Sequence, residues 1–317
     1  MINGYCDAWR QSGYDVRFDC GAPGAARQSR DGGLVVVVDV LSFTTAVSVA
    51  VQAGTRAVYP VAAGGARAAR LAGRVNAALA VARSEVTAQR PWSLSPAALR
   101  LAPPAPRLVL PSPNGSAIAA AVGTSAVAAC LRNAGAVGGW LARRAIDATS
   151  PVTVIAAGER GPNGVLRPAL EDLLGAGAVI AALVARCSGL RLSQEAAAAL
   201  ALHSATPSVP DAVRTCASGL ELADRGYAQD VEVAIETDVD HAVPVLVDGA
   251  FRPALAMVAG VPTARAIPDV PSAPRLGRPA LDHAVRPRSA DAHPRGRVRR
   301  QPTRFEGEAR EQEASLG

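Results

Sequence analysis

A short apolar run followed by an alanine-rich stretch recurs along this chain, and this repeat constrains the fold more than any other feature. The first run is residues 34–38 (LVVVV), and residues 42–53, which come after it, are predicted to form a helix. Continuous β-branched runs are typical of strands buried on both faces, rather than of strands with one face in water. Strands that alternate with helices pair in parallel, so the repeat predicts a parallel sheet covered by helices.

The repeat continues toward the C-terminus. Further strands are predicted at residues 56–61, 107–110, 125–130 and 151–156. Helices are predicted at residues 114–122, 134–145, 168–186 and 193–204. Helices on both faces of a mostly parallel sheet define the α/β class, which is expected here as a three-layer α/β/α sandwich.

The pattern changes after residue 204. Residues 230–235 (DVEVAI) alternate between polar and apolar side chains, which predicts a strand with one exposed face. Residues 243–251 form two short apolar runs around Asp248-Gly249, a strong signal for an antiparallel hairpin. Residues 266–317 are rich in Pro and Arg and lack a hydrophobic period, so they are expected to be a disordered tail. Residues 1–265 are then the folded part, as one domain or as two α/β subdomains.

Lysine is absent from the chain, and all 33 basic side chains are arginines. This absence excludes Schiff-base enzymes, pyridoxal phosphate enzymes and Walker-A nucleotide binders, because each needs the amine of a lysine. A phosphate group would therefore have to be bound by arginine, by backbone amides or through a metal ion.

The net charge of +6 does not indicate a nucleic-acid partner. Residues 266–317 hold ten arginines against seven acids, so half of the excess lies in the expected tail. The other residues show no basic stripe interleaved with aromatics. No apolar run reaches the ~18 residues that a membrane helix needs, and the first residues lack the apolar core of a signal peptide. We expect a cytoplasmic protein without nucleic-acid or membrane partners, and the sequence leaves a homo-oligomer open.

The cysteines and histidines exclude several mechanisms. No C-x-x-C spacing occurs, so reduced thiols are expected at Cys6, Cys20, Cys130, Cys187 and Cys216. The Cys20–Arg27 spacing is one residue too long for a cysteine phosphatase, and no strand is expected before this segment. No histidine lies at ligand spacing from Cys or Glu, which excludes a zinc hydrolase or a Cys–His nucleophile. Dinucleotide binding is unsupported, because no G-x-G-x-x-G motif follows the first strand.

Asp39 is the first candidate site residue, because it ends the first buried strand. Ligands of doubly wound sheets bind beyond the carboxyl ends of the strands. Ser42, Thr44 and Thr45 follow at the start of the predicted helix. Two interpretations stay open: these side chains cap the helix, or Asp39 holds a metal ion while hydroxyls and amides bind an anion.

Two further segments follow predicted strands. Asn114, Gly115 and Ser116 are either a turn with a helix cap or a set of backbone amides for a phosphate. If the strands are parallel, this segment lies at the same end of the sheet as Asp39. Glu159 and Arg160 follow the strand at 151–156, and Glu171 and Asp172 lie in the next helix. Their carboxylates are either a solvated helix start or, together with Asp39, oxygen ligands suited to Mg²⁺.

These segments together resemble the 2-phosphosulfolactate phosphatase (ComB) family. The matching stretches are VVVVDVLSFTTAV, PSPNGSAIA, AAGERG with LEDLLGAGAVI, and ASGLEL with RGYAQDVEVA and VPVL. They occur in order between about residues 14 and 251 and cover most of the expected folded part. The resemblance implies a Mg²⁺-dependent hydrolase of an α-hydroxy acid phosphoester on an α/β/α sandwich, with 2-phosphosulfolactate as substrate.

The resemblance also implies roles for the candidate residues. Mg²⁺ would be held by Asp39 with Glu171 or Asp172 and with Glu159, and the phosphate would be bound by Asn114, Gly115, Ser116, Thr44 and Thr45. The nucleophile is either a metal-bound water or Asp39 itself. Many relatives carry arginine where this chain has Ser42 and Leu220, so the substrate is also open. The alternatives are a different small phosphoester as substrate, or a non-catalytic binding role. Arg160 is the residue expected to compensate for one of the two missing arginines.

Overall fold

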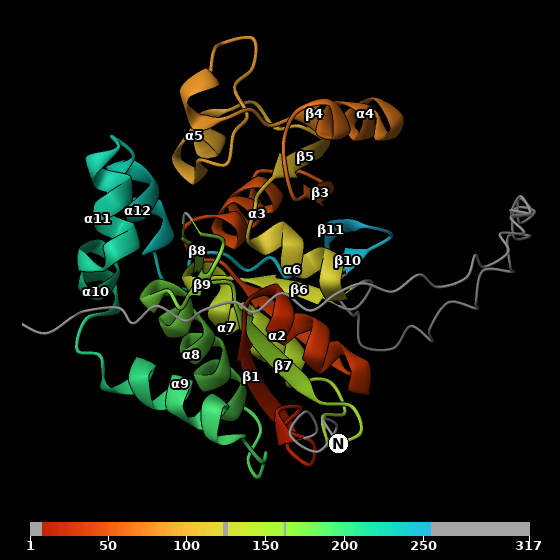
Figure 1. The fold of residues 1–317 in the computed structure, drawn as a ribbon, viewed down its shortest axis with the longest axis vertical. Helices are drawn as coiled ribbons and strands as arrows, with labels where there is room; N and C mark the ends of the chain where they lie inside the picture. Colours follow the sequence, from red (N-terminus) through yellow and green to blue (C-terminus); the bar gives the residue numbers. More distant parts are fainter. Residues whose placement is uncertain (1–7, 123–125, 162, 255–317) are drawn as a thin grey trace, which may run out of the picture. The chain divides into compact units, whose positions relative to one another are not determined.

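The computed structural model describes residues 8–122, 126–161 and 163–254 (Figure 1). The strands are β1 (Val16–Cys20), β2 (Leu34–Val38), β3 (Ala57–Val61), β4 (Ala78–Leu79), β5 (Arg107–Pro111), β6 (Ala126–Ala129), β7 (Val152–Ala156), β8 (Glu159–Arg160), β9 (Leu166–Arg167), β10 (Pro244–Val247) and β11 (Ala250–Pro253). The α-helices are α2 (Gly21–Gln28), α3 (Phe43–Gln52), α4 (Ala66–Val75), α5 (Pro96–Leu101), α6 (Gly115–Val122), α7 (Ala134–Leu141), α8 (Leu170–Val184), α9 (Gln194–Ala205), α10 (Val209–Thr215), α11 (Ala217–Asp224) and α12 (Ala228–Ala234). Short 3₁₀ helices are η1 (Ser29–Asp31), η2 (Arg83–Glu85) and η3 (Leu131–Asn133).

Within the described residues, nine strands form one sheet in the order β1-β7-β2-β6-β10-β11-β3-β5-β4. Strands β1, β7, β2 and β6 are mutually parallel, and so are β3, β5 and β4. The hairpin β10–β11 lies between the two groups and pairs antiparallel on both sides. The two parallel groups therefore run in opposite directions. The expected mostly parallel sheet with a C-terminal hairpin is confirmed, but the strands do not share a single direction.

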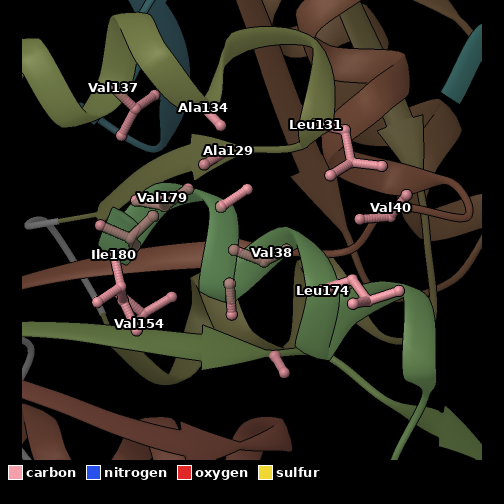
Figure 2. Packing of buried hydrophobic residues seen from close by; sticks show 14 of the residues in the cluster. Val38, Val40, Ala129, Leu131, Ala134, Val137, Val154, Leu174, Val179 and Ile180 are labelled. Carbon is pink, nitrogen blue, oxygen red and sulfur yellow. The ribbon is translucent and has the colours of Figure 1, made fainter. Parts of the chain in front are cut away.

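The parallel strand β2 separates two apolar layers. Val36 and Val38 pack into the core under α7, α8 and α9. Figure 2 shows Val38 in this core with Leu174, Val179 and Ile180 of α8. Val35 and Val37 point to the other face and pack against α3 and α6. All four valines are buried, and burying such a side chain contributes about 1.5–3 kcal/mol to the free energy of unfolding. The predicted three-layer sandwich, with strands buried on both faces, is confirmed.

The predicted strand at residues 230–235 is wrong, because these residues lie within helix α12 and its C-cap. The alternating pattern misled because its polar positions were taken to face solvent. Asp230 is instead 1% exposed, and its neighbour Val231 is also buried. Because the carboxylate is buried together with the neighbouring valines, the buried positions follow a helix. The alternation of polar and apolar residues in the sequence does not reveal this.

Strand β1 was not predicted, and the expectation that no strand precedes the Cys20–Arg27 segment is wrong. Strand β1 pairs parallel with β7 at the edge of the sheet, and Cys20 is its last residue. Its sequence alternates apolar and polar residues (VRFDC), so it lacks the continuous apolar run of the central strands. Burial, Asp19 and Asp172 raise the pKa of the Cys20 thiol to about 11, which keeps the thiol protonated.

The hairpin turn has the geometry that Asp-Gly predicts. Asp248 and Gly249 both have positive φ, at 51° and 74°, as a two-residue hairpin turn requires. Cys20, Cys130, Cys187 and Cys216 are free thiols as expected, whereas Cys6 lies outside the described residues. The predicted tail at 266–317 also lies outside them. In the described part, no helix has the length and apolar character to cross a membrane. The cytoplasmic location, the domain boundary and a homo-oligomer stay predictions.

Candidate active site

Asp39 lies where the loops that follow β2 and β5 meet. Its Oδ1 accepts a hydrogen bond from the amide of Phe43 at 3.1 Å, at the start of α3. Its Oδ2 accepts one from the amide of Gly115 at 2.9 Å, at the start of α6. Asp39 is 5% exposed. Asp39 therefore caps its own helix, as one interpretation expected, and also joins the two oppositely directed strand groups at their carboxyl ends.

Gly115 makes this junction because it has no side chain. A Cβ at this position would lie 2.8 Å from Asp39 Oδ2 and would overlap the ring of Phe43. Only glycine lets the backbone amide come close enough to reach the carboxylate. The Asn-Gly pair is therefore required by the contact with Asp39 as well as by the start of α6.

Asn114 and Glu159 form a second contact across the same junction. Asn114 Nδ2 donates a hydrogen bond to Glu159 Oε2 at 2.9 Å, and Glu159 begins the short strand β8 after β7. The other amide atom, Asn114 Oδ1, is buried and has no hydrogen-bond partner in the described part of the chain. A buried carbonyl oxygen without a donor costs free energy, so this atom is available to a ligand or a cation.

A pocket of about 240 Å³ opens beside these three side chains. Its polar lining includes Asp39, Asn114 and Glu159, together with Arg83 and Ser42. The remaining lining is contributed by Leu41, Leu94, Ser112, Pro113, Ser218, Glu221, Leu222 and Arg225. The pocket is small enough for a metabolite of a few carbon atoms and presents both carboxylates and guanidinium groups to it.

Arg83 lines the pocket, although no sequence pattern predicted it. It lies in η2, and its Nη2 donates to the hydroxyl of Ser42 at 2.7 Å. Its Nε donates to the buried Asp230 at 2.8 Å, and its guanidinium lies over the ring of Tyr227, with 5.4 Å between Cζ and the ring centroid. These contacts hold a cation at the rim of the pocket, next to Ser42. Nothing in the local sequence around Arg83 signals this role, because every partner is distant along the chain.

The carboxyl groups of the site repel one another. Burial raises the pKa of Asp39 to about 6 against the two backbone hydrogen bonds, and the Glu171 charge raises it further. Burial and the Asp39 charge raise the pKa of Glu159 to about 7. Burial, Asp39 and Glu171 also raise the pKa of Asp172 well above its ordinary value. Burial and mutual repulsion therefore disfavour the ionised carboxylates, and a bound cation would stabilise them.

Glu171 and Asp172 lie in the first turn of α8, next to the pocket but not in its lining. Asp172 accepts hydrogen bonds from the amides of Val40 at 2.7 Å and of Gly158 at 2.8 Å, which connects the loops after β2 and β7. Glu171 accepts a hydrogen bond from the Cys216 thiol at 3.3 Å. Their roles as metal ligands stay predictions.

Gly115 contacts Asp39 from outside the pocket lining, and the four remaining predicted site residues are not part of the lining either. The hydroxyls of Thr44 and Thr45 donate to the carbonyls of Asp39 and Val40, each at 2.8 Å. The Ser116 hydroxyl contacts the carbonyls of Ser112 and Val61. Arg160 is exposed on β8. The structure thus brings Asp39, Ser42, Asn114, Gly115 and Glu159 together, whereas substrate contacts by Thr44, Thr45, Ser116 and Arg160 stay predictions.

Among residues 8–122, 126–161 and 163–254, no group of three or more His, Cys, Asp or Glu side chains is arranged to hold a metal ion. This does not conflict with Mg²⁺, which binds through one or two carboxylates and keeps several waters or substrate oxygens as ligands. The side-chain atoms of the lining that can coordinate a metal ion are all oxygens, and one of them, Asn114 Oδ1, has no hydrogen-bond partner. The residues present therefore fit Mg²⁺.

An acidic pocket beyond the carboxyl ends of the parallel strands β2 and β7, in a sheet covered by helices, is the arrangement of an α/β enzyme. The model of the 2-phosphosulpholactate phosphatase family matches residues 22–249, so the chain belongs to this family. A relative named 2-phosphosulfolactate phosphatase, from Methanothermobacter thermautotrophicus, is 35% identical over 142 residues. That match covers 45% of this chain and 57% of the relative, so the chain spans little more than half of the relative's length. The resemblance inferred from the sequence motifs is confirmed.

Proposed function

We propose that the protein hydrolyses 2-phosphosulfolactate to sulfolactate and phosphate. The observation that carries this proposal is the junction of Asp39, Asn114 and Glu159 in a small pocket that also presents Arg83. Family membership supports the reaction class. Acidic groups suit a bound cation, and guanidinium groups suit the acidic groups of the substrate.

The proposed cofactor is Mg²⁺. Asp39 and the carbonyl oxygen of Asn114 would hold it, and Glu171 and Asp172 would contribute negative charge from the adjoining turn of α8. When bound, the ion would neutralise charge on the phosphoryl oxygens, which is the main requirement for hydrolysing a phosphate monoester. The rest of the reaction is assigned to side chains of the chain itself.

In the simplest reaction, the oxygen of a water molecule forms a bond to phosphorus while the bond from phosphorus to the ester oxygen breaks. The departing oxygen takes up a proton, and the attacking water releases one to solvent. Glu159 lines the pocket and is oriented by Asn114. A carboxyl with a pKa of about 7 carries a proton part of the time near neutral pH, so Glu159 can supply it. This proposal makes Glu159 the general acid.

Asp39 is an alternative nucleophile. In that case its carboxylate oxygen bonds to phosphorus, the ester oxygen leaves, and water then hydrolyses the acyl phosphate. The two routes differ in a covalent intermediate. Borohydride added during turnover reduces an acyl phosphate, so a mass change in the peptide that contains Asp39 would establish the covalent route. An unmodified peptide under conditions of full turnover would favour direct attack by water.

Arg83 is proposed to bind an acidic group of the substrate. Its guanidinium already contacts the hydroxyl of Ser42, a position at which the family resemblance implies an arginine in many relatives. The guanidinium of Arg83, in η2, therefore places a positive charge next to Ser42, whose own side chain carries none. Arg225, at the end of α11, is the second arginine of the lining.

Leu220 is 51% exposed and lies outside the pocket lining, so it contributes no charge to the site. A different small phosphoester therefore stays a second candidate substrate, and a non-catalytic anion-binding protein is the alternative of another class. Phosphate release should be measured with 2-phosphosulfolactate and a panel of phosphomonoesters, with Mg²⁺ or with EDTA. Release from 2-phosphosulfolactate that depends on Mg²⁺ supports the proposal. Release from another ester but not from 2-phosphosulfolactate would identify that other ester as the substrate. No release from any ester would favour the non-catalytic binding protein.

A further inference from the structure

Helix α4 carries three arginines on one side. Arg67, Arg70 and Arg74 are separated by three and four positions, so they follow one another along a single face of the helix. The helix contains no acidic residue. All three side chains are exposed, and in the described part of the chain none of them makes an ion pair or a side-chain hydrogen bond. By contrast, Arg214 on another exposed surface pairs with both Asp211 and Glu232.

These arginines line a cavity of about 740 Å³ between α4, α6 and the end of β3. Its apolar lining includes Val61 and Leu71, and its far side includes Ser116 of α6. Cavities of ~300–1,000 Å³ are typical of sites for small molecules. No lining residue is shared with the pocket that contains Asp39. The cavity is thus a separate, strongly basic site of small-molecule size.

The three guanidinium groups in the lining indicate which kind of ligand the cavity would bind. Each guanidinium presents a planar fork of N–H donors that matches the oxygens of a phosphate group. Arg67 and Arg74 are seven positions apart, which corresponds to about 10 Å along a helix, more than one phosphate group spans. The apolar lining offers contact to an uncharged part of a ligand. We propose that this cavity binds a small molecule that carries two or more phosphate groups.

The test measures binding by calorimetry at fixed ionic strength, with inorganic pyrophosphate and ADP as separate probes. The variant is Arg70→Gln, which removes the central arginine from an exposed helix face. The matched control is Arg143→Gln, which removes an exposed arginine with no side-chain partner among the described residues. We expect Arg70→Gln to weaken binding by about tenfold, as the loss of a charge-assisted hydrogen-bond pair should, and Arg143→Gln to leave it unchanged.

Comparing the two probes distinguishes an organic ligand that carries phosphate groups from an inorganic phosphate ligand. Tighter binding of ADP than of pyrophosphate shows that the apolar lining contributes and that the ligand is organic, whereas equal binding shows recognition of the phosphates alone. Three results overturn the proposal: wild-type affinity in Arg70→Gln, equal weakening in Arg143→Gln, or binding of duplex DNA without binding of either small probe. Arg70→Gln should keep the rate of 2-phosphosulfolactate hydrolysis, and a parallel loss of that rate would assign the binding to the Asp39 pocket instead.

Discussion

The amide of Gly115 donates a hydrogen bond to the carboxylate of Asp39 over 2.9 Å, although the two residues follow strands of opposite direction. One strand group provides Asp39 and Glu159, and the other provides Asn114 and Gly115. The pocket is therefore assembled from both groups, and neither forms it alone. Changes at this junction should act on catalysis and on stability together.

Gly115→Ala should abolish most activity. The added Cβ overlaps the Phe43 ring and lies 2.8 Å from Asp39 Oδ2, so the amide must move away from the carboxylate. Overpacking of this kind costs about 1–3 kcal/mol of unfolding free energy. Urea unfolding and phosphate release measure the two effects. The control is Gly73→Ala in α4, where nothing lies within 4 Å of the new Cβ. That change should stabilise the helix by about 0.5–1 kcal/mol and leave phosphate release unaltered.

Asp39→Asn should lower kcat by about a hundredfold or more, because an amide supplies neither the charge for a cation nor a nucleophilic carboxylate. Circular dichroism and phosphate release with saturating Mg²⁺ check this result. Asp248→Asn is the matched control, since Asp248 occupies a hairpin turn whose positive φ suits Asn equally. Full activity in folded Asp39→Asn would exclude both nucleophile assignments.

Glu159→Gln tests the charge balance of the pocket. Burial and the Asp39 charge raise the pKa of Glu159 to about 7 in the folded protein, whereas glutamate in an unfolded chain titrates near about 4.3. The folded state keeps this proton when the unfolded state has released it, so the contribution of Glu159 to stability falls as pH rises from about 4 to about 7. Gln does not titrate.

The Tm of the wild type should therefore fall relative to that of Glu159→Gln between pH 5 and pH 8. Added Mg²⁺ should reduce the difference at pH 8, because a bound cation stabilises ionised carboxylates. Scanning calorimetry at several pH values measures both effects. A Tm difference that is the same at every pH would mean that Glu159 titrates like an exposed acid, contrary to its place in the pocket.

Arg83→Gln should raise KM for 2-phosphosulfolactate by about tenfold, because one bidentate contact to an acidic group is lost. Asp230→Asn should raise KM in the same direction with Arg83 intact, since Asp230 fixes the guanidinium through its Nε at 2.8 Å. Steady-state kinetics separate KM from kcat. Arg56→Gln, at an exposed arginine outside the pocket lining, should leave both constants unchanged. A wild-type KM in Arg83→Gln would remove Arg83 from substrate binding.

The central strands and half of the site could be predicted from local sequence. The run LVVVV specifies a strand buried on both faces, and the rule that ligands bind beyond strand ends selected Asp39, Asn114 and Glu159. Arg83 and Asp230 could not be selected in this way. Their contact joins positions 147 residues apart, and Asp230 was placed on the exposed face of a strand. Buried ion pairs between distant segments leave no periodic pattern in either segment.

The position of the hairpin β10–β11 determines when the sheet can be completed during synthesis. The hairpin pairs with β6 on one side and with β3 on the other, and so connects two strand groups that lie entirely before it in the chain. During synthesis, the ribosome completes both groups before residues 244–253 emerge to connect them. Contacts between such distant segments form slowly. A nascent chain that ends before the hairpin therefore carries every residue of the Asp39 pocket but lacks the strands that connect its two halves through the sheet.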